Sequence, residues 1–593
     1  MRTALASVFA WLLSASLALA GPISGYPPAS SPLSGTEGLI GTQSGSTVQI
    51  TPAQIAAYDA ASGLKILNAA AYGIVCNGST DNAAAFTAIN AAWTAGTLLY
   101  FPPQTANCVT SKGLVAPSNA TLYAFPGTVT LQAAAAETGN LLLTVSGVSN
   151  VTVYGVTFDG NINSIGNTNT NVVVYSASYV DFDNDKFQNT RGIPLLFSTN
   201  IQYSGVRNST FYNVGMYWQT SSSQSDQIQG VAFCCGTVIN TSASQGSPGT
   251  TLTFTSTSGV SVGNLVKADP SPYYTAGGSA VVSKTTTTVT LNQSTALAVP
   301  SGTGVMFSNN YGNYVLDNTF NLTGLDAISM SDQSHLRIEG NHCNTVGGAI
   351  SGNALTSPTG AACIWISNIN GGAIVGNSSY LAGQNGFDMS FLNGVTVNGN
   401  QVFNSGSGGF MLAGSRNVTV TGNTSENNSQ NTATSSFTGG FSLALQTGNL
   451  AESNLVFVGN VALDNQGTQT QKYGLQLYGT GTTVSDLWVD DSNSFIGNLT
   501  SQFGGTGINP TVSSCGTSPT VNTVSTTASG QVTVGSTTTT CTITFGEPLT
   551  NAPKCIVTDE GAVALTYSTS NTAITVSGTS LGGTKLDYRC ART

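Results

Sequence analysis

The sequence contains few charged residues. Only 7% of its 593 residues are Asp, Glu, Lys or Arg, and it has two histidines. The 25 acidic residues outnumber the 15 basic ones, so the formal net charge is −10, and the basic residues form no cluster along the chain. Nucleic-acid binding needs clustered positive charge that displaces counterions from phosphates, so we expect no nucleic-acid partner. A hydrophobic content of 40% predicts a folded chain rather than a disordered one.

Long apolar runs are lacking beyond the first 20 residues. The opening "MRTALASVFAWLLSASLALA" has Arg2, an apolar stretch, and small residues at Ala18 and Ala20. This order predicts a secretory signal peptide cleaved after Ala20. A membrane anchor is the alternative, which the short apolar run and the small-residue end disfavour. We therefore expect a secreted protein, extracellular or at the cell surface, with no membrane partner after cleavage.

Cys-x-x-Cys pairs are also lacking, and two histidines leave few ligands for a zinc site. Ten cysteines in an exported chain instead predict disulfides. Four of them lie near the C-terminus, where three pairings are open. The ten are Cys76 and Cys108 around a helix-like segment, Cys343 and Cys363 around a loop, the adjacent Cys234 and Cys235, and the C-terminal Cys515, Cys541, Cys555 and Cys590.

A short repeat is abundant. "NVTVTGNTSENNS" from Asn417 and "GVTVNGNQVFNSG" from Gly394 share a strand-like run, a Gly-Asn pair and a second apolar run. Apolar residues alternate within each copy, as in Val418 and Val420, which predicts strands with one inward face. A step of about 23 residues holds three strands and three turns, so the repeat predicts one coil of a parallel β-helix. The equivalent asparagines are Asn318, Asn341, Asn377, Asn400, Asn423 and Asn460.

Stacked coils would place equivalent residues ~4.8 Å apart. We expect the repeated asparagines to form a ladder in which each side-chain amide bonds to the next coil. Asparagine also tolerates the left-handed backbone that a tight corner needs. A leucine-rich horseshoe is the alternative repeat fold, but its leucine pattern is missing.

The predicted fold class is all-β, with a right-handed parallel β-helix, an N-terminal capping helix, a small β insertion and a C-terminal β-sandwich. Short strand-like runs without the asparagine repeat predict the insertion, and alternating Val, Thr and Ile predict the sandwich. The expected parts are a signal peptide (1–20), a linker or tail-like segment (21–63), two β-helix segments (64–220 and 311–504), the insertion (221–310) and the sandwich (513–593).

The stretch Lys65–Pro103 resembles the opening of pectate-lyase-superfamily proteins. The matching residues are Tyr72-Gly73, Asn77-Gly78, Asp81 and Phe101-Pro102, around an Ala-rich segment; Asn82 stands where the family often has a second Asp. The resemblance implies a β-helix whose open end is capped by a helix over Asn82–Ala95. Separately, Pro32–Tyr58 and the C-terminal module are similar to parts of phage tail proteins. The sequence leaves open whether the chain forms a homotrimer.

The resemblance implies processing of a polysaccharide or surface glycan, as a lyase or a glycoside hydrolase. "LDAISM" (Leu325–Met330) is similar to a catalytic strand of polygalacturonases, with Asp326 at the position of the second Asp. Leu325 replaces the first Asp, and the Gly-His-Gly run is missing, so we do not expect that complete site. The alternative function is a non-catalytic glycan-binding adhesin or a tail-spike-like surface protein.

Counting back from the asparagine ladder predicts one outward column. Asp326 and Asp388 would lie two coils apart, about 10 Å, near the upper range for the two carboxyls of inverting glycosidases. Trp365 between them could stack on a sugar ring, and Asp332 lies just beyond the same strand. The alternative is that these Asp residues are solvated or bond to the backbone at corners. The column is Ser329, Trp365, Asp388, Met411, Ser442 and Gln476.

A lyase would need an Arg or Lys base and Ca²⁺ held by carboxylates. Arg337 is the first candidate base, and Arg416, beside the outward column, is a second. Glu339 and Arg416 are also candidate substrate-binding residues, together with Trp365; ordinary surface solvation is the alternative. Ca²⁺ is the cofactor that this chemistry would use, but its ligands are not identified by the sequence. "DFDND" from Asp181 to Asp185 would place three carboxylates on one strand face, where they bind a cation or face solvent.

Overall fold

The structure is a computed structural model with two compact units, Met1–Lys65 and Ile66–Thr593. In the first unit, β1 (Leu39–Gln43) pairs antiparallel with β2 (Ser46–Ile50). The predicted signal peptide lies outside the described residues, as does most of the predicted tail-like segment. The described residues are 39–43, 46–50 and 65–593, except for 135–140, 162–169, 216–228, 246–248, 270–277, 296–297, 348, 352–353, 357–360, 432–435, 446–450, 480, 482, 506–507 and 562.

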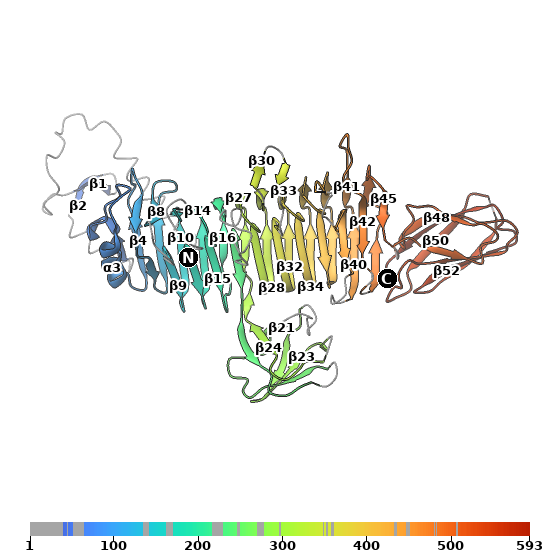
Figure 1. Cartoon of the computed structure of the whole chain (residues 1–593), viewed down its shortest axis with the longest axis horizontal. Helices are drawn as coiled ribbons and strands as arrows, with labels where there is room; N and C mark the ends of the chain where they lie inside the picture. The colour runs from blue at the N-terminus through green and yellow to red at the C-terminus, as the bar shows by residue number, and fades with distance from the viewer. Residues whose placement is uncertain are drawn as a thin grey trace. The chain divides into compact units, whose positions relative to one another are not determined.

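The second unit contains a right-handed parallel β-helix, as the repeat predicted (Figure 1). In one coil, β28 (Ile328–Glu339) bends at a corner and continues into β29 (His342–Val346). The next coil repeats this with β32 (Ile364–Val375) and β33 (Ser378–Ala382), and the strands of the two coils pair in parallel. Each coil therefore adds one layer to two long sheets.

The shorter of these sheets has 12 strands. Besides β29 and β33 it contains β5 (Cys108–Thr110), β8 (Thr130–Ala133), β11 (Thr157–Asp159), β14 (Lys186–Thr190), β17 (Thr210–Val214), β27 (Thr319–Thr323), β35 (Gln401–Phe403), β38 (Thr424–Glu426), β41 (Val461–Leu463) and β44 (Ser494–Ile496).

The longer sheet has 23 strands and turns a corner within each coil. Besides β28 and β32 it contains β3 (Lys65–Asn68), β4 (Thr97–Phe101), β6 (Leu114–Ala116), β7 (Ala120–Ala124), β9 (Leu143–Ser146), β10 (Ser149–Tyr154), β12 (Val172–Tyr175), β13 (Ser178–Asp183), β15 (Leu195–Ser198), β16 (Gly205–Arg207), β18 (Val231–Cys234), β25 (Asn310–Tyr311), β26 (Tyr314–Leu316), β34 (Phe387–Asn398), β36 (Phe410–Ala413), β37 (Arg416–Thr421), β39 (Gly439–Ala444), β40 (Glu452–Val458), β42 (Tyr473–Tyr478), β43 (Val484–Val489) and β45 (Ser501–Gly504).

Alternate residues of each strand fill the interior. In β34, Phe387, Met389 and Val397 are fully buried, while Thr396 between two inward residues is exposed. Like residues stack from coil to coil, as in the parallel rings of Phe187 and Phe211, whose centroids are 4.8 Å apart. Burial of one face of every strand supplies the main stabilising term of the fold.

The predicted asparagine ladder is confirmed. Nδ2 of Asn377 donates to Oδ1 of Asn400 at 2.9 Å, and Nδ2 of Asn400 donates to Oδ1 of Asn423 at 2.9 Å. Each amide also donates to a backbone carbonyl, as Asn400 does to Ile374 at 2.8 Å. The ladder runs from Asn318 to Asn493, so the repeat satisfies buried donors and acceptors along the axis.

The corners use left-handed backbone. Asp332, Asn368 and Phe391 occupy one corner of successive coils with φ of 57°, 56° and 55°. The next corner has His335 at 56° and Asn417 at 53°. Asparagine is the commonest non-glycine residue with positive φ here, since its side chain tolerates this region best.

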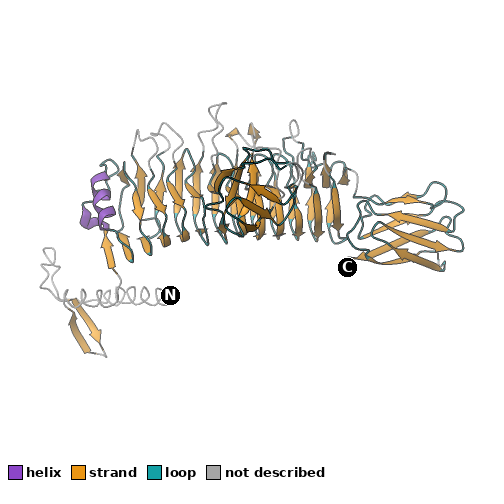
Figure 2. Ribbon diagram, turned by 90° about the horizontal axis from the view of Figure 1, so that it is seen from below, coloured by secondary structure: helices purple, strands orange, loops and turns teal. Residues whose placement is uncertain are grey.

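The predicted N-terminal helix is present but shorter than expected, since α3 spans Ala83–Ala92; the 3-10 helix η1 (Ala69–Tyr72) precedes it. Phe86 and Ile89 of α3 are fully buried in the β-helix core. Figure 2 shows α3 (purple) beside the first strands of the β-helix. Asn82 at the helix start accepts a hydrogen bond from Val75 N and donates one to Val109 O, which connects the loop at Val75 to β5.

A β insertion leaves the β-helix after β18 and returns before β25 (Figure 1). It has two three-stranded antiparallel sheets around a separate apolar core that includes Phe254 and Phe307. One sheet contains β19 (Thr237–Asn240), β24 (Gly304–Ser308) and β21 (Leu265–Asp269); the other contains β20 (Thr251–Thr253), β23 (Thr288–Leu291) and β22 (Val281–Lys284). A two-stranded hairpin of β30 (Ala349–Ser351) and β31 (Ala354–Thr356) extends from a later coil.

The C-terminal module has two four-stranded antiparallel sheets that share one apolar core. Trp488 of β43 belongs to this core, so the module packs against the last coils of the β-helix. One sheet contains β46 (Thr511–Ser513), β49 (Thr540–Thr544), β52 (Ala573–Gly578) and β51 (Leu565–Thr569); the other contains β47 (Thr520–Val521), β48 (Ser529–Thr533), β53 (Lys585–Ala591) and β50 (Lys554–Asp559).

The ten cysteines form five disulfides: Cys76–Cys108, Cys234–Cys235, Cys343–Cys363, Cys515–Cys541 and Cys555–Cys590. The structure thus selects one of the three C-terminal pairings and joins the adjacent pair to each other. Disulfides at this density are typical of proteins that fold in an oxidising compartment. Within the described part of the chain, no helix has the length and apolar character required to span a bilayer.

Candidate functional site

The predicted column exists. Ser329 pairs with Trp365, Trp365 with Asp388, and Asp388 with Met411, each on the neighbouring strand. The same register continues through Ser442 to Gln476. Trp365 and Asp388 are half-buried, whereas Ser329 and Met411 are buried. The side chains that remain accessible are therefore at the middle of the column, where the sequence placed the candidate site.

The C-terminal end of the column is covered. Phe437 packs on Met411, Ala413 and Ala444. The backbone N of Thr438 donates to Oε1 of Gln476 at 2.9 Å, which fixes this segment over the sheet. A ligand can therefore approach Trp365 and Asp388 but not Gln476.

Asp326 is not a surface residue, so that expectation is wrong. Its side chain is 5% exposed, and Oδ1 accepts a hydrogen bond from Ala362 N of the next coil at 2.7 Å. This is the corner-bonding arrangement that the sequence left as an alternative. Burial raises the pKa of Asp326 well above its usual value, and the nearby charge of Asp388 raises it further. Burial therefore favours the protonated form of Asp326.

Asp388 lies close to the same corner. Asn385 occupies the position equivalent to Asp326 two coils on, by the register of the following strands, and its Nδ2 donates to Oδ2 of Asp388 at 3.2 Å. Burial raises the pKa of Asp388 to about 6, and this hydrogen bond opposes the rise. Burial therefore raises the pKa of both carboxyls.

Asp332 and Arg416 hold the insertion in place rather than facing the column. Oδ1 of Asp332 accepts from Nδ2 of Asn368 at 2.8 Å, and its carbonyl accepts from Oγ of Ser308 at 2.8 Å. Oδ1 of Asn368 in turn accepts from Gly278 N of the insertion at 3.1 Å. Arg416 donates to Oε1 of Gln293, also in the insertion. The expectation that Asp332 and Arg416 lie open beside the column is therefore wrong, because the insertion folds back onto this corner.

Arg337 and Glu339 face outward, as predicted, but they pair with each other. Nη2 of Arg337 lies 2.7 Å from Oε2 of Glu339, and Nε lies 2.9 Å from Oε1. The Glu339 carboxylate raises the pKa of Arg337, which keeps the guanidinium protonated. Both follow the second corner of the coil, on a different face from Asp388. The structure therefore separates this pair from the candidate carboxyls.

The expected row of three carboxylates in "DFDND" is only partly correct. Asp181 and Asp183 face outward and share Arg207, whose Nη2 lies 2.7 and 2.9 Å from their oxygens. Tyr314 lies across Gly205 and donates to Oδ1 of Asp181 at 2.6 Å. Asp185 instead turns into the corner, where Oδ1 accepts from Val156 N. In the described ranges, no three His, Cys, Asp or Glu side chains form a metal-ligand group.

Two features near these sites were not predicted. Asn385 looked like an ordinary loop residue, and only the coil register relates it to Asp326. An exposed aromatic column follows the second corner: the ring centroids of Tyr179 and Tyr203 are 5.0 Å apart, those of Tyr203 and Tyr311 5.4 Å, and those of Tyr311 and His335 4.7 Å. Aligning the coils from Tyr179 onward would have revealed this column in the sequence.

No family model matches the sequence, and no curated protein matches it. Among solved structures, the chain is similar to the A-module of the mannuronan C-5 epimerase AlgE4 of Azotobacter vinelandii, at 13% identity and a TM-score of 0.43, over 74% of this chain and 95% of that one. The Dettilon tailspike protein is similar at 13% identity and a TM-score of 0.39, over 89% and 94%.

An exopolygalacturonase from Thermotoga maritima is similar at 8% identity and a TM-score of 0.32, over 73% of this chain and 94% of that one. The fold of this chain is a parallel β-helix, as its own strand topology establishes. Matches at these identities and TM-scores carry no argument about function, which has to be argued from the side chains.

Proposed function

We propose that this protein is a secreted polysaccharide-processing protein that hydrolyses a glycan at Asp326 and Asp388. The observation that carries the proposal is a pair of neighbouring carboxyls in different environments: Asp326 is buried at the corner, and Asp388 is half-buried in the column. Burial raises the pKa of Asp388 to about 6 and that of Asp326 well above its usual range. Two carboxyls in such different environments are suited to act as acid and base. Trp365 pairs in register with Asp388 and offers its ring to a sugar.

The proposed chemistry is inverting hydrolysis. Asp326 gives its proton to the glycosidic oxygen as the bond from that oxygen to the anomeric carbon breaks. Asp388 takes a proton from a water molecule, whose oxygen forms the new bond to the anomeric carbon. Two coil spacings amount to about 10 Å, near the upper end of the separation that leaves room for this water.

The lyase alternative receives less support. Its base would be Arg337 or Arg416, but Arg337 pairs with Glu339 on another face and Arg416 contacts the insertion. Ca²⁺ would need a group of carboxylate ligands, and the described side chains provide none beside Asp388. The proposed hydrolysis requires neither an arginine base nor a metal.

A panel of purified polysaccharides tests the proposal. New reducing ends without ultraviolet-absorbing unsaturated products would support hydrolysis, and an inverted anomer seen by NMR would support the separate acid and base. Unsaturated products would instead establish a lyase. Binding without any cleavage would favour the second candidate function below.

Two substitutions sharpen this test. Asp388→Asn and Asp326→Asn should each lower kcat by about 10²–10⁴-fold, the range for loss of a general acid or base. Asparagine keeps an acceptor oxygen for Ala362 N, so Asp326→Asn should still fold. Asp185→Asn is the matched control, a buried carboxyl in a distant coil, and should retain full activity. Trp365→Ala should raise KM more than it lowers kcat. Equal activity of Asp388→Asn and the wild type would contradict the proposal.

The pH profile gives an independent readout. Activity requires Asp388 ionised, so the rate should fall as the pH drops through about 6. Asp388→Asn should remove this acidic limb from any residual activity.

The second candidate function is glycan binding without cleavage, as in an adhesin. The exposed aromatic column at the second corner favours it, since Tyr179, Tyr203 and Tyr311 are 54%, 42% and 37% exposed. Such rings offer apolar area and hydroxyl groups to a sugar chain. Under this alternative, Tyr179→Ala should weaken glycan binding, while Asp388→Asn should leave it unchanged.

A further inference from the structure

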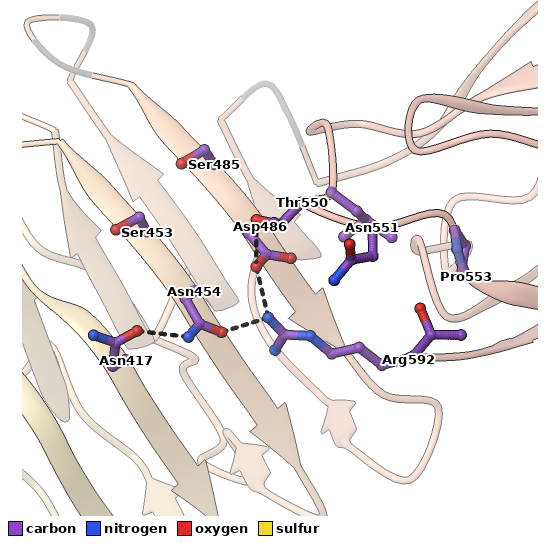
Figure 3. A pocket seen from close by; sticks show the side chains of 11 residues that line it. Asn417, Ser453, Asn454, Ser485, Asp486, Thr550, Asn551, Pro553 and Arg592 are labelled. Atoms are coloured by element: carbon purple, nitrogen blue, oxygen red, sulfur yellow. Dashed lines mark hydrogen bonds and ion pairs between the residues drawn. The ribbon is translucent and has the colours of Figure 1, made fainter.

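The last coils of the β-helix and the C-terminal module enclose a pocket of about 380 Å³ (Figure 3). This volume lies within the range of small-molecule sites. The β-helix residues of the pocket lie one to three coils beyond Asp388 and at the second corner of the coils, a different face from Asp388, so the pocket does not belong to the proposed reaction. Its β-helix wall carries Ser453, Asn454, Ser485 and Asp486, and its other wall carries Asn551 and Arg592.

The charges in the pocket are already paired. Nη2 of Arg592 lies 2.7 Å from Oδ2 of Asp486, and the same guanidinium contacts Oδ1 of Asn454. Thr550 Oγ1 donates to Oδ2 of Asp486 at 3.0 Å. An anionic ligand would therefore meet the Asp486 carboxylate, and a cationic one the Arg592 guanidinium. A neutral ligand avoids both of these like-charge repulsions.

Three polar side chains in the pocket remain available to a ligand. Across the described part of the chain, the hydroxyls of Ser453 and Ser485 and the amide of Asn551 make no hydrogen bond to protein. Ser453 and Ser485 are register partners on neighbouring strands, so both project from the same face. Together these groups offer several donors and acceptors.

This lining selects the chemical class of ligand. An apolar molecule would desolvate the hydroxyls and the amide without replacing their hydrogen bonds, at a cost of about 1–3 kcal/mol for each buried group. A polyhydroxylated ring can pair with them, and Leu549 and Pro553 offer apolar contact for its C–H face. We infer that this pocket is a second, non-catalytic site that binds a neutral monosaccharide unit, free or within a glycan.

The test is titration of the full chain with glucose, galactose, mannose and N-acetylglucosamine, followed by saturation-transfer NMR or calorimetry. The described lining of the pocket contains no aromatic ring, so we expect binding in the millimolar range. Ser485→Ala and Asn551→Ala should each weaken binding about three- to tenfold, the value of one or two hydrogen bonds. Neither side chain has a hydrogen-bond partner among the described residues, so both variants should fold normally.

Thr419→Ala is the matched control, an exposed residue of β37 outside the pocket, and should leave the affinity unchanged. The inference is overturned if none of the four sugars binds, or if both pocket variants bind as tightly as the wild type. Tighter binding of glucuronate than of glucose would overturn the neutral class. Asp388→Asn should bind the sugars normally, which separates this test from that of the proposed hydrolysis.

Discussion

The asparagine ladder and the buried carboxyls occupy similar corner positions, but they complete different numbers of hydrogen bonds. Asn400 donates to Asn423 and Ile374 and accepts from both nitrogens of Asn377. Glu452 accepts from Ser415 N through Oε2 at 2.8 Å, and its Oε1 has no partner within the described structure. Asp185 likewise accepts a hydrogen bond from Val156 N, and its Oδ2 has no hydrogen-bond partner within the described structure.

This difference follows from the chemistry of the two groups. An amide is both donor and acceptor, so it can repeat from coil to coil without leaving an atom unpaired. An ionised carboxylate only accepts, and its charge is costly in the interior. Burial therefore raises the pKa of Asp185 well above its usual value and that of Glu452 to about 8, so it favours the protonated form of both groups. Buried amides thus support the fold at all pH values, whereas buried carboxyls make it sensitive to pH.

The largest expected effect on stability is that of breaking the ladder. Asn400→Ala leaves Asn377, Asn423 and a carbonyl unpaired in the interior, so the free energy of unfolding should fall by about 3–5 kcal/mol. Urea denaturation measures this change. Asn398→Ala is the control, an exposed asparagine of the same coil, and should change stability by less than about 0.5 kcal/mol. Similar losses for both variants would show that the ladder adds little.

The second-largest expected effect is on the pH dependence of stability and concerns Glu452. Its pKa is raised from 4.5 to about 8 in the folded state, so its contribution to stability is complete below pH 4.5 and is lost as the pH rises to about 8. Glu452→Gln should remove a pH-dependent loss on the order of 3 kcal/mol across that window. Denaturation at pH 5 and pH 8.5 measures it. Parallel pH profiles for variant and wild type would contradict the role of burial.

A smaller effect on stability is expected at Asp185, a carboxyl residue at the position that asparagine occupies in the ladder coils. Asp185→Asn removes the cost of a raised pKa and supplies a donor, so the free energy of unfolding at pH 7 should rise by about 1 kcal/mol. The gain should shrink at pH 3, because Asp is then largely protonated in the folded and the unfolded chain alike. An equal gain at both pH values would mean that titration is not its source.

The smallest effect should come from the exposed pair of Arg337 and Glu339. Arg337→Ala should change the free energy of unfolding by less than about 0.5 kcal/mol, since surface ion pairs contribute little. Thermal unfolding at low and high salt measures this. A loss comparable to that of Asn400→Ala would show that surface charge, rather than the buried ladder, stabilises the coils.

Much of the architecture was predictable from the sequence. The repeated Gly-Asn pair predicted the coil, the asparagine ladder, and the register that aligns Ser329, Trp365 and Asp388. These features follow from period alone, because strand alternation fixes which side chains face inward and coil length fixes which residues stack. The candidate column could therefore be located without any structure.

Only the tertiary structure decided how deeply the candidate site residues are buried and which groups they contact. Asp326 is buried because its carboxyl bonds to the next coil, and Asp332 and Arg416 are engaged because the insertion folds back through Gly278 and Gln293. The pocket at Arg592 requires the C-terminal module to meet strands more than 100 residues away in sequence. These contacts join segments that do not share the coil repeat, so the repeat pattern gives no information about the contacts.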